Sequence, residues 1–427
     1  MHRIALLAAA GLPVAISGVA LAEPASQPTD NDAVRAMVAE MLADADSRSS
    51  LLQGGGSAGH DGKFFLASPD GAFTLKVSGQ IQFRYIANFR NESDGVDPID
   101  PADDVDSFDH GFTTGRTALR FEGNVFDPSL IYGLQAKFNS DGGDFVLEDA
   151  FVGKVFDSGL ILLAGQYREP ILWEDVVAVR NSLAVDYSVV NAVFRQDRSQ
   201  GIWIHKQLED YRYWAGVNQG IRGENTSFVN SPADIGATTR WEYKFSGDWS
   251  QFDQFTSAPG SQMASKLGGG VHYEIGKHTA AGDTDNSVFA YTADYMVEGD
   301  GWSAYVAGVG LYTDLDTGGS FNDMGFLAQG SLYFNDDWEG FARYDVVIPD
   351  GDRAGDDEFS TVTVGVNRYL HGQAAKFTLD LQYFLDATTD NDLVSSIAGG
   401  SIGERIGLLA SPDDGQVAIR AQFQLLF

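Results

Sequence analysis

The sequence predicts an all-β fold, a closed antiparallel β-barrel of about 16 strands that crosses a membrane. Three observations support this prediction. Apolar and polar side chains alternate over long segments from residue 73 onward. The 427 residues include 49 glycines, and aromatic residues make up 12% of the chain. The chain ends on an alternating segment whose last residue is Phe427. Soluble sandwiches also alternate, but their strands are shorter and have no reason to carry Phe and Tyr on the outside.

The first predicted strand, residues 73–85, shows the alternation most clearly. One face is apolar and consists of Phe73, Leu75, Val77, Gly79, Ile81, Phe83 and Tyr85. The other face consists of Thr74, Lys76, Ser78, Gln80, Gln82 and Arg84. Because successive side chains of a strand point to opposite sides, we expect the first face to meet lipid and the second to meet water. The same pattern recurs at residues 132–139, 237–245, 377–385 and 417–427.

A sheet inside hydrocarbon must close on itself, because every backbone N–H and C=O group there needs a partner. Residues 63–427 are assigned to this barrel. At ~10 residues per strand, with turns and loops between them, this length corresponds to about 16 strands. A barrel of this size is wide enough for an aqueous channel.

The amino-terminal part is predicted to be separate from the barrel. Residues 1–22 have the features of a secretory signal peptide, with an apolar run after Arg3 and an Ala-Leu-Ala cleavage site at residues 20–22. Residues 23–62 are predicted to be periplasmic, with an amphipathic helix over residues 32–52 and a Gly-rich linker at residues 54–59. The helix could self-associate into a short bundle or dock on the main domain. Past the signal peptide, no segment reaches the ~18 to 20 consecutive apolar residues of a spanning helix, so we expect the bacterial outer membrane.

The charge is strongly acidic, with 28 basic and 60 acidic residues and a formal net charge of −32. Such a chain would repel a phosphate backbone, which makes nucleic acid a poor partner. Acidic residues crowd two segments, residues 94–109 and 350–358. These segments could be solvated outer loops, or they could bind divalent cations, since carboxylates suit Ca²⁺ and Mg²⁺. Neither has the spacing of an EF-hand loop, so no specific metal site follows.

The strand positions assigned to the lumen reverse this balance. Five are acidic: Glu122, Glu242, Glu339, Asp345 and Asp380. Nine are basic: Lys76, Arg84, Arg116, Arg120, Lys137, Arg240, Lys244, Arg343 and Arg420. Rings of basic side chains lower the barrier for anions, and the guanidinium group suits phosphate oxygens. We therefore expect these positions to line an anion path.

The long segment 171–200 interrupts the strand rhythm, and we hypothesise that it folds into the lumen as a constriction. It would add Arg180, Arg195 and Arg198 to the pore-lining residues. The alternative is an outward loop in which these arginines pair with Asp186 and Asp197.

The sequence argues against an enzyme. The seven histidines are scattered, with no H-E-x-x-H pair and no G-x-S-x-G motif in the mature chain. No predicted strand carries a recognisable combination of Ser, His and Asp that could form a catalytic triad. The absence of cysteine excludes thiol catalysis and Cys-ligated metals. We predict neither catalysis nor a cofactor.

Five segments resemble the phosphate-selective porin O and P family of outer-membrane proteins. They are residues 111–123 with an Arg-containing strand, 147–152 (LEDAFV), 165–170 (GQYREP), 188–198, and 365–380 with GVNRYLHG and KFTLD. The resemblance implies a sixteen-stranded trimeric barrel with an inward-folded third loop that constricts an anion-favouring pore. The family's best-known members line the pore with many basic residues, whereas this chain is acidic overall.

The leading functional prediction is passive diffusion of small anions through a homotrimeric channel in outer-membrane lipid, with phosphate as the solute that the resemblance implies. A second hypothesis is a weakly selective general porin whose acidic loops attract cations. A third is a structural outer-membrane protein tethered to the cell wall through its amino-terminal helix.

Overall fold

The computed structural model describes residues 56–91, 93–96, 104–105, 107–138, 143–276, 286–316 and 318–427. The chain divides into two units, Met1–Gly55 and Gly56–Phe427, of which the second is described. The predicted signal peptide and amphipathic helix lie outside the described residues, so both stay predictions. No described helix is long and apolar enough to cross a membrane.

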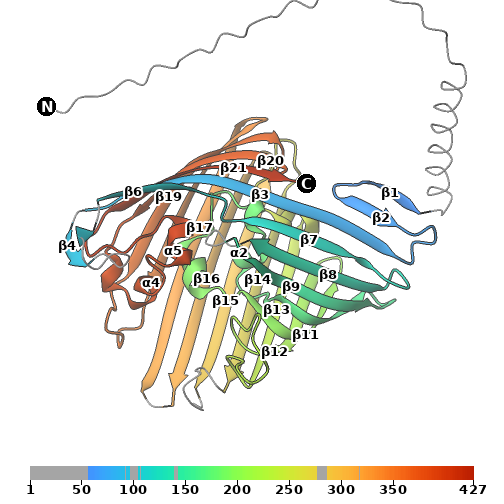
Figure 1. Cartoon of the computed structure of the whole chain (residues 1–427), viewed down its shortest axis with the longest axis horizontal. Helices are drawn as coiled ribbons and strands as arrows, with labels where there is room; N and C mark the ends of the chain where they lie inside the picture. Colours follow the sequence, from blue (N-terminus) through green and yellow to red (C-terminus); the bar gives the residue numbers. More distant parts are fainter. Residues whose placement is uncertain are drawn as a thin grey trace, which may run out of the picture. The chain divides into compact units, whose positions relative to one another are not determined.

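Gly56–Phe427 forms an antiparallel sheet that closes into a barrel (Figure 1). Within the described residues, 16 strands make up the barrel: β3 (Thr74–Phe89), β7 (Thr117–Asn124), β8 (Leu130–Phe138), β9 (Phe145–Val155), β10 (Leu160–Arg168), β11 (Arg198–Gln207), β12 (Tyr211–Asn218), β13 (Ile235–Ser246), β14 (Ala264–Ile275), β15 (Ser287–Gly299), β16 (Trp302–Leu315), β17 (Gly319–Asn335), β18 (Trp338–Ile348), β19 (Phe359–His371), β20 (Ala375–Phe384) and β21 (Gln416–Leu426). A further segment, β6 (Phe108–Thr113), continues the line of β7 along β3. The barrel closes where β21 pairs with β3, from Val417 opposite Phe89 to Leu426 opposite Gln80. The predicted closed barrel of about 16 strands is confirmed.

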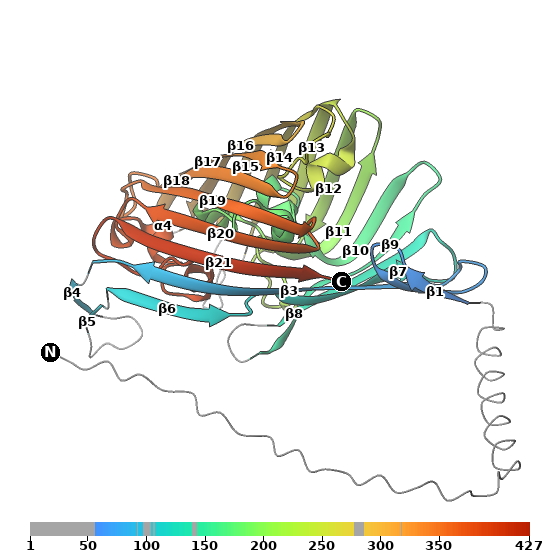
Figure 2. The same cartoon turned by 90° about the horizontal axis from the view of Figure 1, so that it is seen from above.

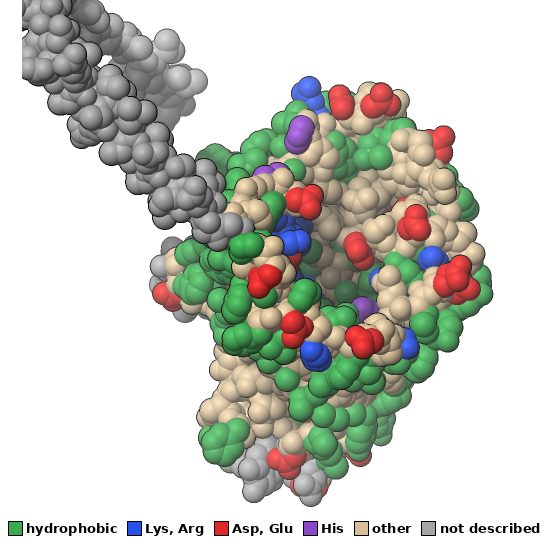
Figure 3. Space-filling view, turned by 90° about the vertical axis from the view of Figure 1, so that its right-hand side faces the viewer, with side chains coloured by type: hydrophobic (Ala, Val, Ile, Leu, Met, Phe, Trp, Pro, Cys, Tyr) green, Lys and Arg blue, Asp and Glu red, His purple; other side chains and the backbone are tan. Residues whose placement is uncertain are grey.

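The alternation of side chains is also confirmed. In β21, Ile419 is 38% and Phe423 43% exposed on the outer face, whereas Arg420 is fully buried inside. On the side of the barrel seen in Figure 3, hydrophobic side chains form much of the outer surface, and a hollow opens among polar and charged side chains. The last residue is fixed by two backbone hydrogen bonds, from the Gly79 N–H to the Phe427 carbonyl at 2.7 Å and from the Phe427 N–H to the Gly79 carbonyl at 3.0 Å. A Cβ at Gly79 would lie 2.4 Å from the Phe427 ring, so this close approach requires glycine.

Two small sheet elements were not predicted. The strands β1 (Ser57–His60) and β2 (Phe64–Ala67) form a hairpin that pairs through β2 with β3, at the same end of the barrel as the carboxyl terminus (Figure 2). The segment expected to be a Gly-rich linker therefore runs into a strand. The cause is the length of β3, whose residues 74–77 extend past the end of β21 and leave an edge that β2 occupies. At the other end, β4 (Ser93–Val96) pairs with β5 (Asp104–Val105).

Three of the connections carry short helices in the described ranges. The inner loop is residues 169–197, with α2 (Trp173–Val176), η1 (Val179–Asn181) and α3 (Val189–Phe194). The insert is residues 247–263, with η2 (Trp249–Asp253). The last loop is residues 385–415, with η3 (Thr388–Asp390), α4 (Asp392–Ser395) and α5 (Ser401–Ile406).

All three connections contribute to one hydrophobic core inside the barrel. Leu172 and Trp173 come from the inner loop, Phe252 and Phe255 from the insert, and Ile406 from the last loop. They pack with inward side chains of the wall such as Met296, Tyr305, Val309, Leu327 and Phe341. The part of the lumen next to β15–β18 is therefore filled with protein, and open space has to lie elsewhere.

Candidate functional site: the basic cavity

The inner loop lies inside the barrel because wall side chains satisfy its backbone groups, which could not remain buried without hydrogen-bond partners. Three wall side chains donate to its carbonyls: Asn367 to Leu183 at 3.0 Å, Lys376 to Ser182 at 2.9 Å, and Arg343 to Asp186 at 3.0 Å. Two wall carboxylates accept from its N–H groups: Asp380 from Val185 at 2.9 Å and Asp345 from Val189 at 3.0 Å. The loop is thus held from β18, β19 and β20.

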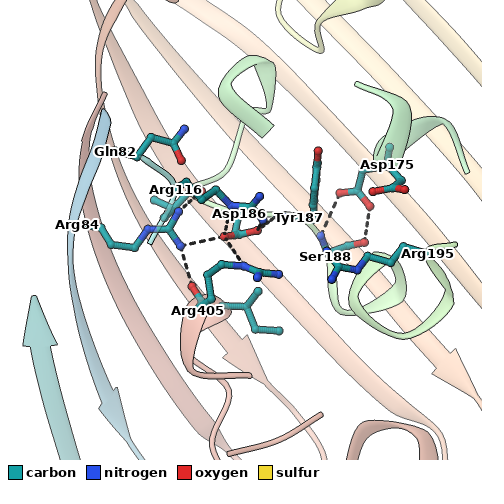
Figure 4. A network of polar contacts seen from close by, with 12 residues as sticks. Gln82, Arg84, Arg116, Asp175, Asp186, Tyr187, Ser188, Arg195 and Arg405 are labelled. Carbon is teal, nitrogen blue, oxygen red and sulfur yellow. Dashed lines mark hydrogen bonds and ion pairs between the residues drawn. The ribbon is translucent and has the colours of Figure 1, made fainter. Parts of the chain in front are cut away.

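Asp186 is the most heavily paired carboxylate of the inner loop (Figure 4). Arg84 from β3 binds it at 2.8 Å, Arg116 just before β7 at 2.6 Å, and Arg405 from α5 at 3.5 Å. Burial works to raise the pKa of Asp186, but attraction by Arg116, Arg405 and Arg84 outweighs it and holds the pKa well below its usual value. One negative charge thus faces three positive charges, which leaves the cluster net positive.

A cavity of about 700 Å³ lies between the inner loop and the wall formed by β7–β12. Nine basic side chains line it: Arg116, Arg120, Lys137, Arg168, Arg180, Arg195, Arg198, Arg212 and Arg405. Five acidic side chains line it as well: Asp144, Glu148, Asp149, Asp197 and Asp253. The lining is basic in a chain whose total charge is strongly acidic.

The structure divides the residues predicted to line the pore. Six of them are on the cavity wall: Arg116, Arg120, Lys137, Arg180, Arg195 and Arg198. Four point inward but are buried away from it: Arg84, Arg240, Arg343 and Arg420. Lys76 is exposed and lies outside the cavity, opposite Glu122 in the register of β3 and β7. Lys244 does not line the cavity either, and its Nζ lies 5.5 Å from the centre of the Trp249 ring.

The four buried arginines hold the inward loops in place. Arg240 donates to the Ile171 carbonyl at 2.8 Å, and Arg420 donates to the Ile406 carbonyl at 2.7 Å. Arg84 and Arg343 bind Asp186, through its carboxylate and its carbonyl respectively. The alternation correctly gives their direction, but the space in front of them is occupied by a loop and not by water.

Most basic side chains on the cavity wall have a carboxylate partner. Arg198 binds Asp149 at 2.9 Å and Asp197 at 2.8 Å, and Arg195 binds Asp197 at 3.2 Å. The pairing with Asp197 that was expected of an outward loop is therefore present in a loop that folds inward.

Arg180 is the exception. Among the cavity-lining basic residues that the structure describes, it alone has no acidic side chain within 4.0 Å. Its Nη1 donates to the neutral Gln80 Oε1 at 3.3 Å. Burial and the nearby Arg120 lower its pKa. Within the described part of the chain, its positive charge has no directly paired carboxylate.

A second cavity, of about 670 Å³, adjoins the first toward the end that carries the chain terminus. The two cavities share Gln80, Ala118, Arg120, Gln135 and Arg180. His60 and Lys63 of the β1–β2 hairpin and the terminal Phe427 also line the second cavity. Arg180 and Arg120 are thus located where the two cavities meet.

Sequence reasoning missed Arg168, Arg212 and Arg405 as lining residues. Arg212 lies between three indole rings, with its guanidinium carbon 4.8 Å from the Trp173 ring centre, 5.1 Å from Trp214 and 4.4 Å from Trp249. This cluster joins the inner loop, β12 and the insert. The aromatic residues of the segment 247–263 were the available signal, because a solvated connection has no need of Trp249, Phe252 and Phe255.

The insert contacts the inner loop through three hydrogen bonds. The Phe255 N–H donates to the Asn181 carbonyl at 3.1 Å, and the Asn181 side chain donates to the Asp253 carbonyl at 3.0 Å. The Trp173 indole N–H donates to the Phe252 carbonyl at 3.3 Å.

In the described ranges, no group of three or more His, Cys, Asp and Glu side chains is placed to hold a metal ion. Within the second acidic segment, Asp350 accepts hydrogen bonds from the N–H groups of Asn322 and Asp352, and Arg353 pairs with Asp323. The first acidic segment lies largely outside the described residues.

No family model matches the chain, and no curated protein matches its sequence. Solved structures do match. The anion-selective porin from Comamonas acidovorans is 11% identical with a TM-score of 0.55 and covers 83% of this chain and 99% of its own. The outer membrane channel DcaP of Acinetobacter baumannii is 10% identical with a TM-score of 0.54, covering 82% and 97%. OmpT of Vibrio cholerae is 12% identical with a TM-score of 0.52, covering 83% and 98%.

These similarities show the fold, which is a porin-like β-barrel of the bacterial outer membrane. The predicted location is confirmed. The narrower resemblance to the phosphate-selective porin O and P family stays a prediction. In this class of barrel the short turns face the periplasm and the longer loops face outward. The inner loop and the last loop therefore enter from outside, and the insert enters from the periplasmic side.

Proposed function

We propose that the protein is a porin through which small anions, phosphate among them, diffuse passively across the outer membrane. The observation that carries the proposal is Arg180, whose unpaired guanidinium lies where the two cavities meet. An uncompensated positive charge at a narrow point lowers the energy of an anion there and raises that of a cation.

The basic lining supports the same direction of selectivity. The acidic outer loops act over a short range, because mobile ions screen exposed charges beyond about 8 to 10 Å at physiological ionic strength. Charges on the cavity wall lie beside the permeating ion and are screened less. Guanidinium groups also offer several donors in one plane, which suits phosphate oxygens.

Two of the similar solved structures support the proposal that the protein is a porin. One of them is described as an anion-selective porin, and an in-vitro folded OmpT of Vibrio cholerae, 11% identical with a TM-score of 0.50, is described in a trimer form. We include a homotrimer and the absence of catalysis in the proposal on these grounds. A weakly selective general porin is the alternative, and the extensive pairing of the other cavity arginines favours it.

The test is the reversal potential of purified protein in a planar lipid bilayer under a KCl gradient. We expect preference for chloride in the wild type, a reduced preference in Arg180→Ala, and a further reduction when Arg195→Ala and Arg198→Ala are added. The matched control is the double variant Arg195→Ala/Asp197→Ala, which removes one charge of each sign and should stay close to wild type. Unchanged anion preference in the triple variant would remove the assignment of this site.

The tethered structural role depends on the amino-terminal helix, which lies outside the described residues. Deletion of residues 30–53 tests it, because normal envelope integrity and normal assembly after the deletion would exclude a tether.

A further inference from the structure

We propose that the last loop forms part of the pore entrance and that its Arg405 is a selectivity-determining residue. This inference rests on the proposed passage of anions, and it assigns a role to a loop and a residue that the sequence did not single out.

Side chains of the barrel wall anchor α5, the helix that carries Arg405. Three consecutive carbonyls at the carboxyl end of α5 each accept a hydrogen bond from a wall side chain. Arg84 donates to the Arg405 carbonyl at 2.7 Å, Arg420 to Ile406 at 2.7 Å, and Asn88 to Gly407 at 2.7 Å. These carbonyls lack partners within the helix. The positive charges of Arg84 and Arg420 also interact favourably with the negative end of the helix dipole. The loop is therefore docked on β3 and β21 inside the barrel.

Gly407 forms the turn that ends α5. Gly407 adopts a φ of +83°, and a Cβ there would lie 2.8 Å from the Ala418 Cβ. Both the left-handed backbone and the close approach to β21 favour glycine. Ile406 and Leu408, on either side, are buried in the hydrophobic core. The backbone turn at Gly407 and the packing of Ile406 thus fix the direction in which the side chain of Arg405 points.

Arg405 lies among charged groups of both signs. Its side chain lines the 700 Å³ cavity and is 19% exposed. The charged groups that face it are Arg84 from β3, Arg116 from the segment before β7, Lys137 from β8, and Asp186 and Arg195 from the inner loop. Asp186 lies 3.5 Å away and is shared with Arg84 and Arg116. The positive charge of Arg405 is therefore only partly neutralised, and a passing anion would relieve the repulsion among these groups.

This setting makes the charge of Arg405 sensitive to alkaline pH. Burial, and then repulsion by Arg116, lowers the pKa of Arg405 to about 9. The guanidinium is charged below this value and loses its charge as the pH rises through it. Its contribution to anion preference should therefore be present at neutral pH and fade above about pH 9.

The experiment compares wild type, Arg405→Gln and Arg405→Lys by reversal potential in a KCl gradient, at neutral pH and again about one unit above the pKa of Arg405. At neutral pH, we expect Arg405→Gln to lower the anion-to-cation permeability ratio about fivefold to sixfold. One unscreened charge roughly 8 Å away in a watery lumen changes the passage of an anion about 2.4-fold and that of a cation by the same factor in the opposite direction. Arg405→Lys should give a ratio between those of the wild type and Arg405→Gln, because burial and the neighbouring arginines lower the pKa of a lysine at this position as well. At alkaline pH, the difference between wild type and Arg405→Gln should shrink.

The control is Arg368→Gln, which removes the same charge from an exposed position outside the cavity and should leave the ratio unchanged. Retention of the folded band in unheated SDS gels identifies variants that still form the barrel. If Arg405→Gln fails to fold, the comparison of Arg405→Lys with the wild type still tests the inference. The lysine should lose its charge at a lower pH than the arginine, so the anion preference of Arg405→Lys should fall at a lower pH, and identical pH profiles would overturn the inference. An anion-selective wild type with an unaltered Arg405→Gln ratio would overturn it, whereas a cation-selective wild type would overturn the proposed function.

Discussion

Asp186 shows how one carboxylate organises the constriction at the level of single residues. It is completely buried, it pairs with arginines from two parts of the wall and from α5, and its carbonyl accepts from Arg343. Buried ion pairs of this kind contribute little net stability compared with a hydrophobic replacement, but the loss of one partner leaves an isolated charge in a poorly solvated place.

We therefore expect Asp186→Asn to destabilise the protein by about 3 to 5 kcal/mol, because Arg84 would be left buried without its counter-ion. The temperature at which the folded band disappears in SDS gels should fall clearly. Asp337→Asn, in an exposed turn between β17 and β18, is the control and should leave that temperature nearly unchanged. Equal behaviour of the two variants would contradict the role given to Asp186.

The pH dependence of the inner loop follows from Glu174. This buried side chain accepts hydrogen bonds from the Ser188 N–H at 3.0 Å and the Ser188 hydroxyl at 2.5 Å. Burial raises its pKa to about 7, although the nearby Arg343 opposes the shift. The folded state thus holds this proton more tightly than the unfolded state does. The stabilisation is complete below the usual carboxyl value and is lost as the pH rises through about 7.

Glu174→Gln should remove this contribution to the pH dependence while keeping an acceptor for Ser188. The measurement is the heat-dissociation temperature of both proteins at several pH values between about 5 and about 8. The wild type should lose stability relative to the variant as the pH rises through this range. Parallel curves for the two proteins would show that Glu174 is not protonated in the folded state.

The insert explains, at the level of elements, why only one side of the lumen is open. It enters from the periplasmic side, places Phe252 and Phe255 in the core, and hydrogen-bonds with the inner loop through Asn181. Short turns at the same end, such as residues 300–301 and 336–337, make no comparable intrusion.

Replacement of residues 249–257 by a short Gly-containing turn should widen the pore. Removal of the two buried Phe side chains alone would cost about 3 to 5 kcal/mol each, and the inner loop would lose its support. We expect a higher single-channel conductance and a weaker ion preference than in the wild type. A folded variant with the conductance of the wild type would show that the insert does not position the inner loop.

The regular part of these elements was predictable, and the irregular part was not. A period of two shows which side chains face inward; β21 follows it along its length, and β3 follows it clearly from Ile81 to Tyr85. It does not show whether water or another segment lies in front of them, so Arg84 and Arg240 could not be distinguished from true lining residues. The inward fold of residues 385–415 depends on contacts between Arg84, Arg420 and α5 carbonyls that are far apart in sequence. The only local signal was the row of apolar residues such as Val394, Ile397 and Ile406.

The whole molecule separates three environments: lipid outside, packed protein on one side of the interior, and a basic cavity on the other. A substitution on the outer face tests whether this face contacts lipid. Val306 in β16 is 49% exposed on that face. Val306→Arg should cost about 2 to 4 kcal/mol if the position lies near the middle of the membrane. The same change at Val229, 59% exposed in the loop between β12 and β13, should be nearly neutral. Refolding equilibria in lipid vesicles measure both, and equal costs would contradict the lipid-facing assignment.

The proposed function requires that the pore prefers anions to cations. Among the residues that the structure describes, a chain with a net charge of −32 places nine basic and five acidic side chains on the wall of its cavity, and Arg180, at the junction with the second cavity, has no carboxylate partner among them. The most direct measurement is the zero-current potential of the wild-type protein in a planar bilayer separating two KCl concentrations. A potential of the sign set by chloride is the predicted result, and a potential of the sign set by potassium would contradict the account.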